Sequence, residues 1–220
     1  MVFLSEDQKV FYKNNGYIVL KNLLTPEELE KISTVYDELF QRKNQENMES
    51  SWVGSDVNNR KTDSGLTVKG IHNLQFHHSV FSEYLHNPRL LDALQDVMGT
   101  PNIALHHTKA HYKPPEKGAA YPMHQDYHYF PYKNDSMVAA FLHLDAASPA
   151  NGGLFVYPGS HLLRPQEDVG ATEGNFHYVD QVYAADDEPL GDQPARPGQG
   201  WMLRGANLDR DASISRRFDQ

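Results

Sequence analysis

The N-terminal half of the chain alternates between helical and strand-like patterns of apolar positions. Ser5 and Gln8 have the spacing of a capping box, which predicts a short helix that ends near Gly16. The run Tyr17–Leu20 is β-branched and aromatic, which predicts a strand. A second capping box at Thr25 predicts a longer helix, whose apolar positions recur at helical spacing at Leu29, Ile32, Tyr36, Leu39 and Phe40.

Farther along the chain the pattern changes from helical to strand-like. Residues 42–66 are polar and rich in Asn, Ser and Asp, which predicts a long loop that is either disordered or part of a site. Asn87 is expected to begin another helix and Gly99 to end it. Beyond that helix the sequence predicts strands over residues 103–112, 137–145 and 154–157. Helices followed by strands indicate an α+β fold with a mainly β core.

The C-terminal stretch, residues 184–220, has a different composition. It combines Pro, Gly, Asp and Arg with scattered bulky residues, and only the run Trp201, Met202 and Leu203 could seed a strand. A chain of 220 residues is long enough for one domain with a substantial core. We therefore expect one domain over residues 1–183. An atypical tail over residues 184–220, disordered or not native, would follow it, with the closing strands missing or altered.

Composition excludes several classes of protein. The net charge of −9 does not favour nucleic-acid binding, and the absence of cysteine excludes a disulfide framework, a thiolate zinc site and a cysteine nucleophile. The N-terminus lacks the basic start and apolar core of a signal peptide, and no apolar run approaches membrane-spanning length. The last three residues are not a peroxisomal tripeptide. These features predict a cytoplasmic protein without a membrane span, and nothing in them indicates an oligomeric state.

His124 and Asp126 form a His-x-Asp triplet. On an extended segment, residues i and i+2 point to the same side, so an imidazole and a carboxylate can contact one cation. Two histidines and one carboxylate on one face of an iron ion leave the opposite face open, which suits a site that also binds a co-substrate and O2. The triplet alone occurs often by chance, so its significance depends on the residues around it.

Four motifs stand in order around this triplet, between Leu105 and His161: LHHTKAHYKPPEKG, YPMHQDYHYFPY, MVAAFLHLD and NGGLFVYPGSH. In this order they resemble the phytanoyl-CoA dioxygenase family, closely over residues 100–165 and more loosely over the N-terminal segment GYIVLKNLLTPEEL. The resemblance implies a double-stranded β-helix, or jelly roll, with flanking N-terminal helices. It also implies a dioxygenase that uses Fe(II), 2-oxoglutarate and O2, with ascorbate as the reductant in vitro. Its reaction would hydroxylate a C–H bond of a small lipid-like substrate such as a fatty acyl-CoA.

The resemblance assigns roles to individual residues. His124 and Asp126 correspond to the first two metal ligands, and Phe141 to the wall of the site. Contacts to 2-oxoglutarate are expected from four residues: Lys69, Thr108, Lys109 and Gln125. Of these, Lys69 could equally be a solvated loop residue. The other histidines of the motifs are expected to be structural, to surround the ligands or to lie on the surface: His106, His107, His111 and His161.

Near its C-terminus the sequence departs from the family pattern. The family carries a second metal-binding histidine about fifty residues after the Pro-Gly-Ser-His motif, and an arginine that binds 2-oxoglutarate about ten residues later. Here no histidine follows His177, which leaves His177 as a candidate substitute and Arg216 or Arg217 as a candidate for the arginine. Either a frameshift or altered splicing has replaced the native end, or the chain is a variant that is inactive or completes its site differently.

Three functions stay open on the sequence alone. The first is the dioxygenase described above. The second is a catalytically inactive or truncated member of the family that acts as a binding protein. The third is a cupin-like protein with a different metal chemistry, which would need three or four clustered ligands.

Overall fold

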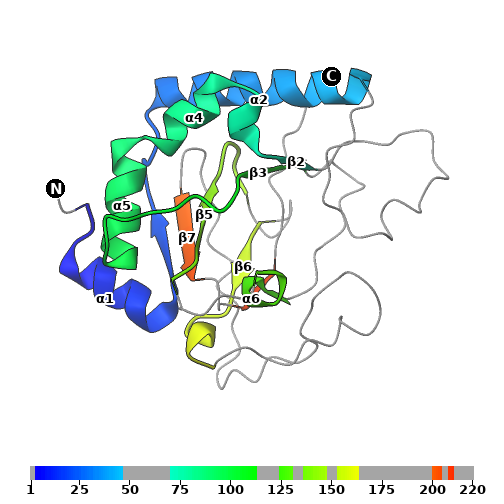
Figure 1. The fold of residues 1–220 in the computed structure, drawn as a ribbon. Helices are drawn as coiled ribbons and strands as arrows, with labels where there is room; N and C mark the ends of the chain where they lie inside the picture. The colour runs from blue at the N-terminus through cyan, green and yellow to red at the C-terminus, as the bar shows by residue number, and fades with distance from the viewer. Residues whose placement is uncertain are drawn as a thin grey trace, which may run out of the picture.

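A computed structural model describes seven segments of the chain: residues 3–46, 70–112, 124–130, 136–147, 153–163, 200–204 and 208–210. Their helices form a layer along two sides of a set of short strands (Figure 1). In these segments, none of the helices has the length and apolar character that crossing a membrane requires.

The first helix, α1, spans Glu6–Asn15, as the sequence predicts. The Gln8 backbone N–H donates to the Ser5 hydroxyl at 3.2 Å, and the Ser5 N–H donates to the Gln8 side chain at 2.9 Å. This capping box satisfies two N–H groups at the start of the helix. Gly16 ends the helix with a φ of 78°, a left-handed conformation that favours glycine. The chain then enters strand β1, Tyr17–Leu20.

Helix α2 spans Pro26–Glu46 and begins with the second predicted capping box, in which Thr25 and Glu28 exchange hydrogen bonds of 2.8 and 3.2 Å. Most of its predicted apolar stripe lies in the core. The helix continues through residues 42–46, where the sequence analysis expects a loop. That expectation is wrong for these residues because Arg, Lys, Gln and Glu are good helix formers even where they present no apolar face.

Two more helices and one 3₁₀ helix complete the helical layer. Helix α5, Pro88–Met98, has Asn87 as its N-cap and Gly99, at a φ of 70°, as its C-cap, as predicted. The 3₁₀ helix η1, Leu74–Phe76, and helix α4, Ser79–Leu85, are not predicted from the sequence. Both are too short to show a clear apolar period.

The strands form three antiparallel sheets. Their order is β1-β7-β5 in the first sheet, β2-β3 in the second and β4-β8-β6 in the third. The remaining strands span Gly70–His72 (β2), Lys109–His111 (β3), His124–Gln125 (β4), Val138–Leu142 (β5), Phe155–Val156 (β6), Gly200–Arg204 (β7) and Leu208–Arg210 (β8). Helices beside antiparallel sheets agree with the predicted α+β class.

The strands predicted between residues 103 and 157 are present but shorter than expected. Strand β3 begins only at Lys109, because the residue before it bonds to η1 instead of to a neighbouring strand. The Asn73 N–H donates to the Thr108 carbonyl at 2.8 Å, and the Leu74 N–H donates to the Thr108 hydroxyl at 2.8 Å. An apolar or aromatic run thus becomes a strand only where the fold supplies a hydrogen-bonded neighbour.

Two strands come from the C-terminal stretch. Strand β7 lies between β1 and β5, with Trp201 opposite both Val19 and Phe141, and strand β8 lies between β4 and β6. The expectation that the closing strands are missing is wrong for these two, because the weak run around Trp201 gains ladder partners on both sides. The rest of residues 184–220, and the question whether this tail is native, lie outside the described residues.

Three apolar clusters hold the helices and strands together. The first packs α2 against α4 and β2, and the second packs α1 against β1 and α5. The third joins β1 to β6 through Tyr17, Leu154 and Val156. Each large apolar side chain that is buried stabilises the fold by about 1.5–3 kcal/mol. Because β6 belongs to the same sheet as β4, the third cluster anchors the sheet that carries His124.

Candidate metal centre

His124 and Asp126 lie where strand β4 gives way to a short helix. Strand β4 ends at Gln125, whose backbone is extended at φ −118° and ψ 130°, and α6, Asp126–Tyr129, begins directly after it. Only His124 is therefore on the strand, but the extended residue between them still leaves both side chains on one side. The His124 Nε2 atom lies 3.8 Å from the Asp126 Oδ1 atom, and the side chains are 12% and 24% exposed. The pair is sheltered and still reachable by an ion.

The two side chains fit the requirements of a metal ion. Imidazole nitrogen and carboxylate oxygen atoms bind first-row metal ions at about 2.0–2.2 Å. Two such atoms at right angles around one ion lie roughly 3 Å apart, and they can be separated by no more than about 4.2 Å. The observed 3.8 Å is within that limit, so a small side-chain rotation brings both atoms to neighbouring positions around an ion. Among the described side chains, no group of three or more potential ligands comes together.

A chain of ring contacts leads from His124 to the segment before β3. Tyr129, at the end of α6, meets the His124 ring edge-on with centroids 5.6 Å apart. The next residue, Phe130, contacts His106 and His107 at centroid distances of 4.8 and 5.3 Å. These ring contacts restrict the His124 imidazole and connect it to the segment that leads into β3.

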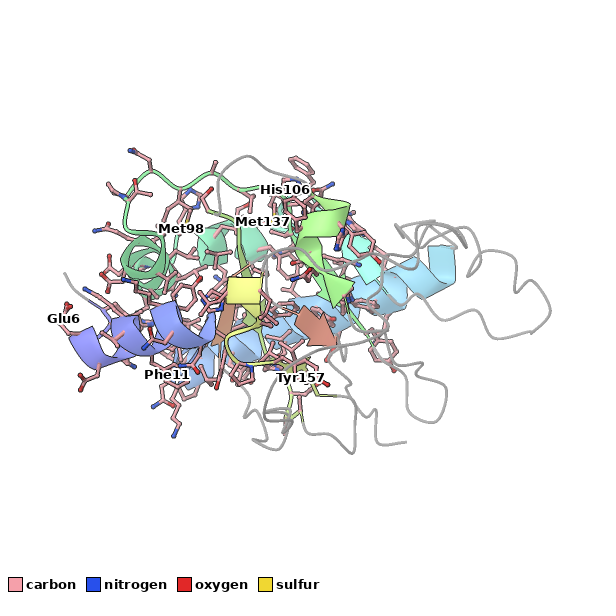
Figure 2. All side chains as sticks on the ribbon, turned by 90° about the horizontal axis from the view of Figure 1, so that it is seen from below. Glu6, Phe11, Met98, His106, Met137 and Tyr157 are labelled. Carbon is pink, nitrogen blue, oxygen red and sulfur yellow. The ribbon has the colours of Figure 1, made fainter. Side chains whose placement is uncertain are left out.

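Three imidazoles, those of His72, His106 and His107, form a cluster beside Phe130. The Nδ1 atoms of His106 and His107 are 2.6 Å apart, and the His107 ring stacks on the His72 ring at 5.9 Å. Figure 2 shows His106 at the periphery of the molecule, well away from Glu6 on α1. This placement agrees with the expectation that His106 surrounds the ligands or lies on the surface.

Two members of this imidazole cluster are neutral at physiological pH. Burial, together with the nearby charges of Lys109 and His107, lowers the pKa of His72 to about 4. Burial and the charges of His106 and Lys109 also lower the pKa of His107. The cluster therefore presents neutral imidazole rings toward the region of Phe130. No spacing in the sequence joins His72 to the other two, so the sequence analysis did not find the cluster.

Two of the expected 2-oxoglutarate contacts lie on or beside β3. The Thr108 hydroxyl accepts the Leu74 N–H and donates to the Gln75 side-chain oxygen at 2.6 Å, so this hydroxyl ties β3 to η1. Lys109 is half-buried and is opposite His72 in the ladder between β2 and β3. Of the two, the Lys109 ammonium is the better suited to an anionic co-substrate, because the Thr108 hydroxyl already makes two hydrogen bonds.

The other expected contacts are placed less favourably or lie outside the described residues. Gln125 is fully buried, and strand alternation puts it on the opposite face of β4 from His124. The structure thus does not bring the Gln125 side chain together with those of His124 and Asp126. The remaining candidates lie outside the described residues: Lys69, His177, Arg216 and Arg217.

Other residues that the sequence singles out serve packing. Phe141 lies on β5 and packs against the third apolar cluster. His161 is buried, and its Nε2 atom lies 2.9 Å from the Lys13 carbonyl oxygen, which ties the turn after β6 to the end of α1. The His111 carbonyl accepts a hydrogen bond from the Tyr36 hydroxyl, which links β3 to α2.

Sequence reasoning missed a second His-x-Asp spacing, formed by His143 and Asp145 after β5. His143 is 2% exposed, and burial raises the pKa of Asp145 to about 6. The repeated spacing is a signal that could have drawn attention to these residues. Their burial places two more titratable groups within the strand region.

A family model described as phytanoyl-CoA dioxygenase (PhyH) matches residues 12–200 of the chain, a range that includes His124 and Asp126. A probable phytanoyl-CoA dioxygenase from Caenorhabditis elegans is 32% identical over 174 residues, covering 74% of this chain and 55% of the relative. The peroxisomal phytanoyl-CoA dioxygenase of Homo sapiens is 31% identical over 173 residues, covering 74% of this chain and 50% of the relative. The chain thus spans about half the length of these curated relatives.

The fold is also found in a solved structure. The crystal structure of EctD from S. alaskensis with 2-oxoglutarate and 5-hydroxyectoine matches with a TM-score of 0.71 at 18% identity, covering 97% of this chain and 72% of that one. At this identity the likeness speaks for the fold alone, and it confirms the predicted jelly roll with flanking helices. With the family match over residues 12–200, these findings show that the chain belongs to the phytanoyl-CoA dioxygenase family.

Proposed function

We propose that this chain is an Fe(II)- and 2-oxoglutarate-dependent dioxygenase that hydroxylates a C–H bond of a small molecule. The observation that carries the proposal is the approach of His124 Nε2 to Asp126 Oδ1, 3.8 Å apart at the end of β4, within a domain of this family. An imidazole and a carboxylate are two of the three ligands that such an iron site uses. When bound, the iron enables O2 to oxidise 2-oxoglutarate to succinate and CO2 while one oxygen atom enters the substrate.

The side chains around the pair have distinct tasks in this proposal. His124 and Asp126 hold the metal ion, and the edge-on contact of Tyr129 keeps the His124 ring in its orientation. Lys109, which the resemblance assigns to 2-oxoglutarate, is the cation that would attract one of its carboxylate groups. The neutral imidazoles of His72 and His107 add no positive charge that would compete with Lys109 for it.

The proposed substrate is lipid-like, with a fatty acyl-CoA as the first compound to test. Two features support this choice. The two curated relatives described above are named for phytanoyl-CoA, and the Tyr129 ring beside His124, with Phe130 in contact with it, offers apolar surface. Stimulation of 2-oxoglutarate turnover by a fatty acyl-CoA, compared with CoA alone, tests this part separately.

A second candidate is a binding protein of the same fold that performs no catalysis. It is favoured by one observation: the sequence has no histidine after His177, although the family places its second metal-binding histidine beyond that point. This candidate predicts a folded chain that binds 2-oxoglutarate or substrate without turning it over.

Succinate formation distinguishes the two candidates. The purified chain is incubated with Fe(II), 2-oxoglutarate, ascorbate and O2, beside the variants His124→Ala and Asp126→Ala. The matched control is His128→Ala, which removes an imidazole from α6 next to the proposed ligands. The dioxygenase predicts succinate from the unaltered chain and from the control, and none from the two ligand variants. Succinate at the level of the enzyme-free blank from the unaltered chain would reject the dioxygenase and favour the binding protein.

A further inference from the structure

One ammonium group and two imidazoles gather on one face of the sheet formed by β2 and β3. His72 is directly opposite Lys109 in this ladder, so their side chains share a face, with Cβ atoms about 4.5–5.5 Å apart. Gly70 is on the same face and leaves room for the lysine, since a Cβ atom on Gly70 would lie 3.6 Å from the Lys109 Cε atom. The His107 ring stacks on the His72 ring, and the Lys109 charge is close enough to lower the pKa of both imidazoles.

The Nε2 atom of His72 is the unexplained feature of this group. It is buried, and within the described part of the chain it has no hydrogen-bond partner. Buried polar atoms nearly always have a partner in proteins, because an unsatisfied one destabilises the fold. The imidazoles nevertheless lead to the surface, since His106 is exposed and its Nδ1 atom is 2.6 Å from that of His107. A polar group of a ligand would supply the missing partner.

The charges around His72 favour a carboxylate as that partner. Lys109 is positive, whereas His72 and His107 are neutral at physiological pH. A neutral imidazole has one N–H donor, and a hydrogen bond from an N–H group to a carboxylate is stronger than one between neutral groups. A metal ion is disfavoured here, because Lys109 repels it and the described side chains include no group of three potential ligands.

Ring contacts connect these side chains to the proposed metal centre. The Phe130 ring contacts the His107 ring at 5.3 Å and the Tyr129 ring at 6.2 Å, and Tyr129 contacts His124 at 5.6 Å. The imidazoles of His72 and His107 therefore belong to the same part of the molecule as His124.

We propose that the His72 Nε2–H group donates a hydrogen bond to a carboxylate of 2-oxoglutarate, the one that the Lys109 ammonium attracts. His72 is then a binding residue that determines how tightly the co-substrate is held, and the stacked His107 ring keeps the His72 ring in its orientation. The inference rests on the proposed function, because it adds a residue to the co-substrate site of that reaction. It accounts for a buried imidazole nitrogen that no described protein group satisfies.

Binding of 2-oxoglutarate to the full-length chain tests the proposal without catalysis. Calorimetry is performed with Mn(II) in place of iron and without O2, so that the co-substrate binds but does not react. His72→Phe keeps a ring that can stack on His107 but has no nitrogen. It should weaken 2-oxoglutarate binding by about 10- to 100-fold, the effect of losing a hydrogen bond to a charged group. The matched control His86→Phe makes the same exchange at the exposed end of α4 and should change the affinity by less than about twofold.

Two further measurements separate ligand binding from a structural role of His72. His72→Gln places an amide N–H group near the position of Nε2, so its affinity should stay within about threefold of that of the unaltered chain. Without ligand, the denaturation midpoint of His72→Phe should equal or exceed that of the unaltered chain, because the variant buries no unsatisfied nitrogen. A purely structural role predicts a lower midpoint and no recovery of affinity in His72→Gln.

Weaker binding in His72→Phe with recovery in His72→Gln supports the inference. Unchanged affinity in His72→Phe overturns the inference alone, as does a loss of affinity in His72→Gln when its circular dichroism matches that of the unaltered chain. A chain that shows no Mn(II)-dependent binding of 2-oxoglutarate before any substitution overturns the proposed function as well.

A measurement on the unaltered chain decides the case in which His72→Phe does not fold. The chain is labelled with ¹⁵N-histidine and loaded with diamagnetic Zn(II), and His72→Gln identifies the His72 resonances by their absence. Saturation with 2-oxoglutarate should shift the Nε2 resonance of His72 and leave that of His86 in place. An Nε2 resonance of His72 that does not move would overturn the inference.

Discussion

The helical layer and the strand region of this molecule are held together by different kinds of interaction. The helices α1, α2, α4 and α5 bury apolar side chains, and one of their ion pairs, Lys31 with Glu83, is at the surface with both side chains 57% exposed. The helical layer also buries the polar side chains of Ser33 and Asn87, whereas the strands and the turn after β6 bury Gln125 and the imidazoles of His143 and His161. The comparison indicates that the helical layer supplies much of the stability, whereas the strand region carries the chemistry and the dependence on pH.

The largest expected effect is a loss of stability in the helical layer. Phe40 on α2 is 4% exposed and packs on Tyr36 and Tyr112 at ring distances of 4.7 and 5.6 Å. We expect Phe40→Ala to lower the free energy of unfolding by about 3–5 kcal/mol, because it removes a large ring and leaves a cavity. Chemical denaturation of the metal-free protein measures this change.

Phe76 offers a matched control for that variant, since its side chain is 82% exposed. Phe76→Ala should change the free energy of unfolding by less than about 0.5 kcal/mol. A loss below about 1 kcal/mol in Phe40→Ala would show that the helical layer is not the main source of stability, and the comparison would fail.

The next effect concerns how the stability that the strand region contributes depends on pH. The folded state holds the pKa of His72 near 4, below the ordinary value of 6.5. Between these values the unfolded chain binds a proton at this residue and the folded chain does not, so stability falls as pH drops from 6.5 toward 4. After allowance for solvent screening, this contribution is about 1–2 kcal/mol.

His72→Gln removes that contribution, so its free energy of unfolding should depend less on pH between 7.5 and 5 than that of the unaltered chain. Denaturation curves at both pH values measure the difference. His86→Gln, at the exposed end of α4, is the control and should keep the original dependence. Identical pH dependence in both variants would contradict the assignment of this effect to His72.

Asp145 is expected to change the pH dependence of stability in the direction opposite to His72. Burial raises its pKa to about 6, above the ordinary value of 3.8. Between these values the folded chain binds a proton that the unfolded chain releases, so stability falls as pH rises from 3.8 to 6 and stays lower above it. Asp145→Asn should therefore be more stable than the unaltered chain at pH 7.5, by about 1 kcal/mol after allowance for screening.

Denaturation at pH 7.5 and at pH 4 checks this expectation, because the gain should disappear at the lower pH. A variant that is less stable than the unaltered chain at pH 7.5 would contradict the assignment of this pH dependence to burial of the Asp145 carboxylate.

The helical layer and the strand region also differ in how much of their structure the sequence predicts. The starts of α1 and α2 are found because Ser5 and Gln8, and Thr25 and Glu28, lie three residues apart and bond locally. His124 and Asp126 are found for the same reason, since the triplet and its surrounding motifs are local. Local spacing is therefore enough for helices α1, α2 and α5 and for the two proposed metal ligands.

The remaining features depend on contacts between distant parts of the chain. Strand β7 has little pattern of its own, and it forms because Trp201 finds Val19 on one side and Phe141 on the other. The stacking of His72 on His107 likewise arises only when β2 and β3 pair.

The pairing of β4 with β8 is the central claim of this account, and an engineered disulfide tests it most directly. The chain has no cysteine, so the variant His124→Cys/Asp209→Cys contains one possible intramolecular pair. Opposite residues in an antiparallel ladder have Cα atoms about 4.5–5.5 Å apart, within the range of about 4.4–6.8 Å that a disulfide spans. The control His124→Cys/Arg210→Cys moves the second cysteine by one position along β8.

Both double variants are oxidised without metal, and the disulfide is measured by the mass loss of two hydrogens in the monomer. We predict a disulfide in the Asp209 variant that forms at least about tenfold faster than in the Arg210 variant, because successive residues of a strand point to opposite faces of the sheet. Equal rates in the two variants, or a disulfide only in the Arg210 variant, would contradict the pairing.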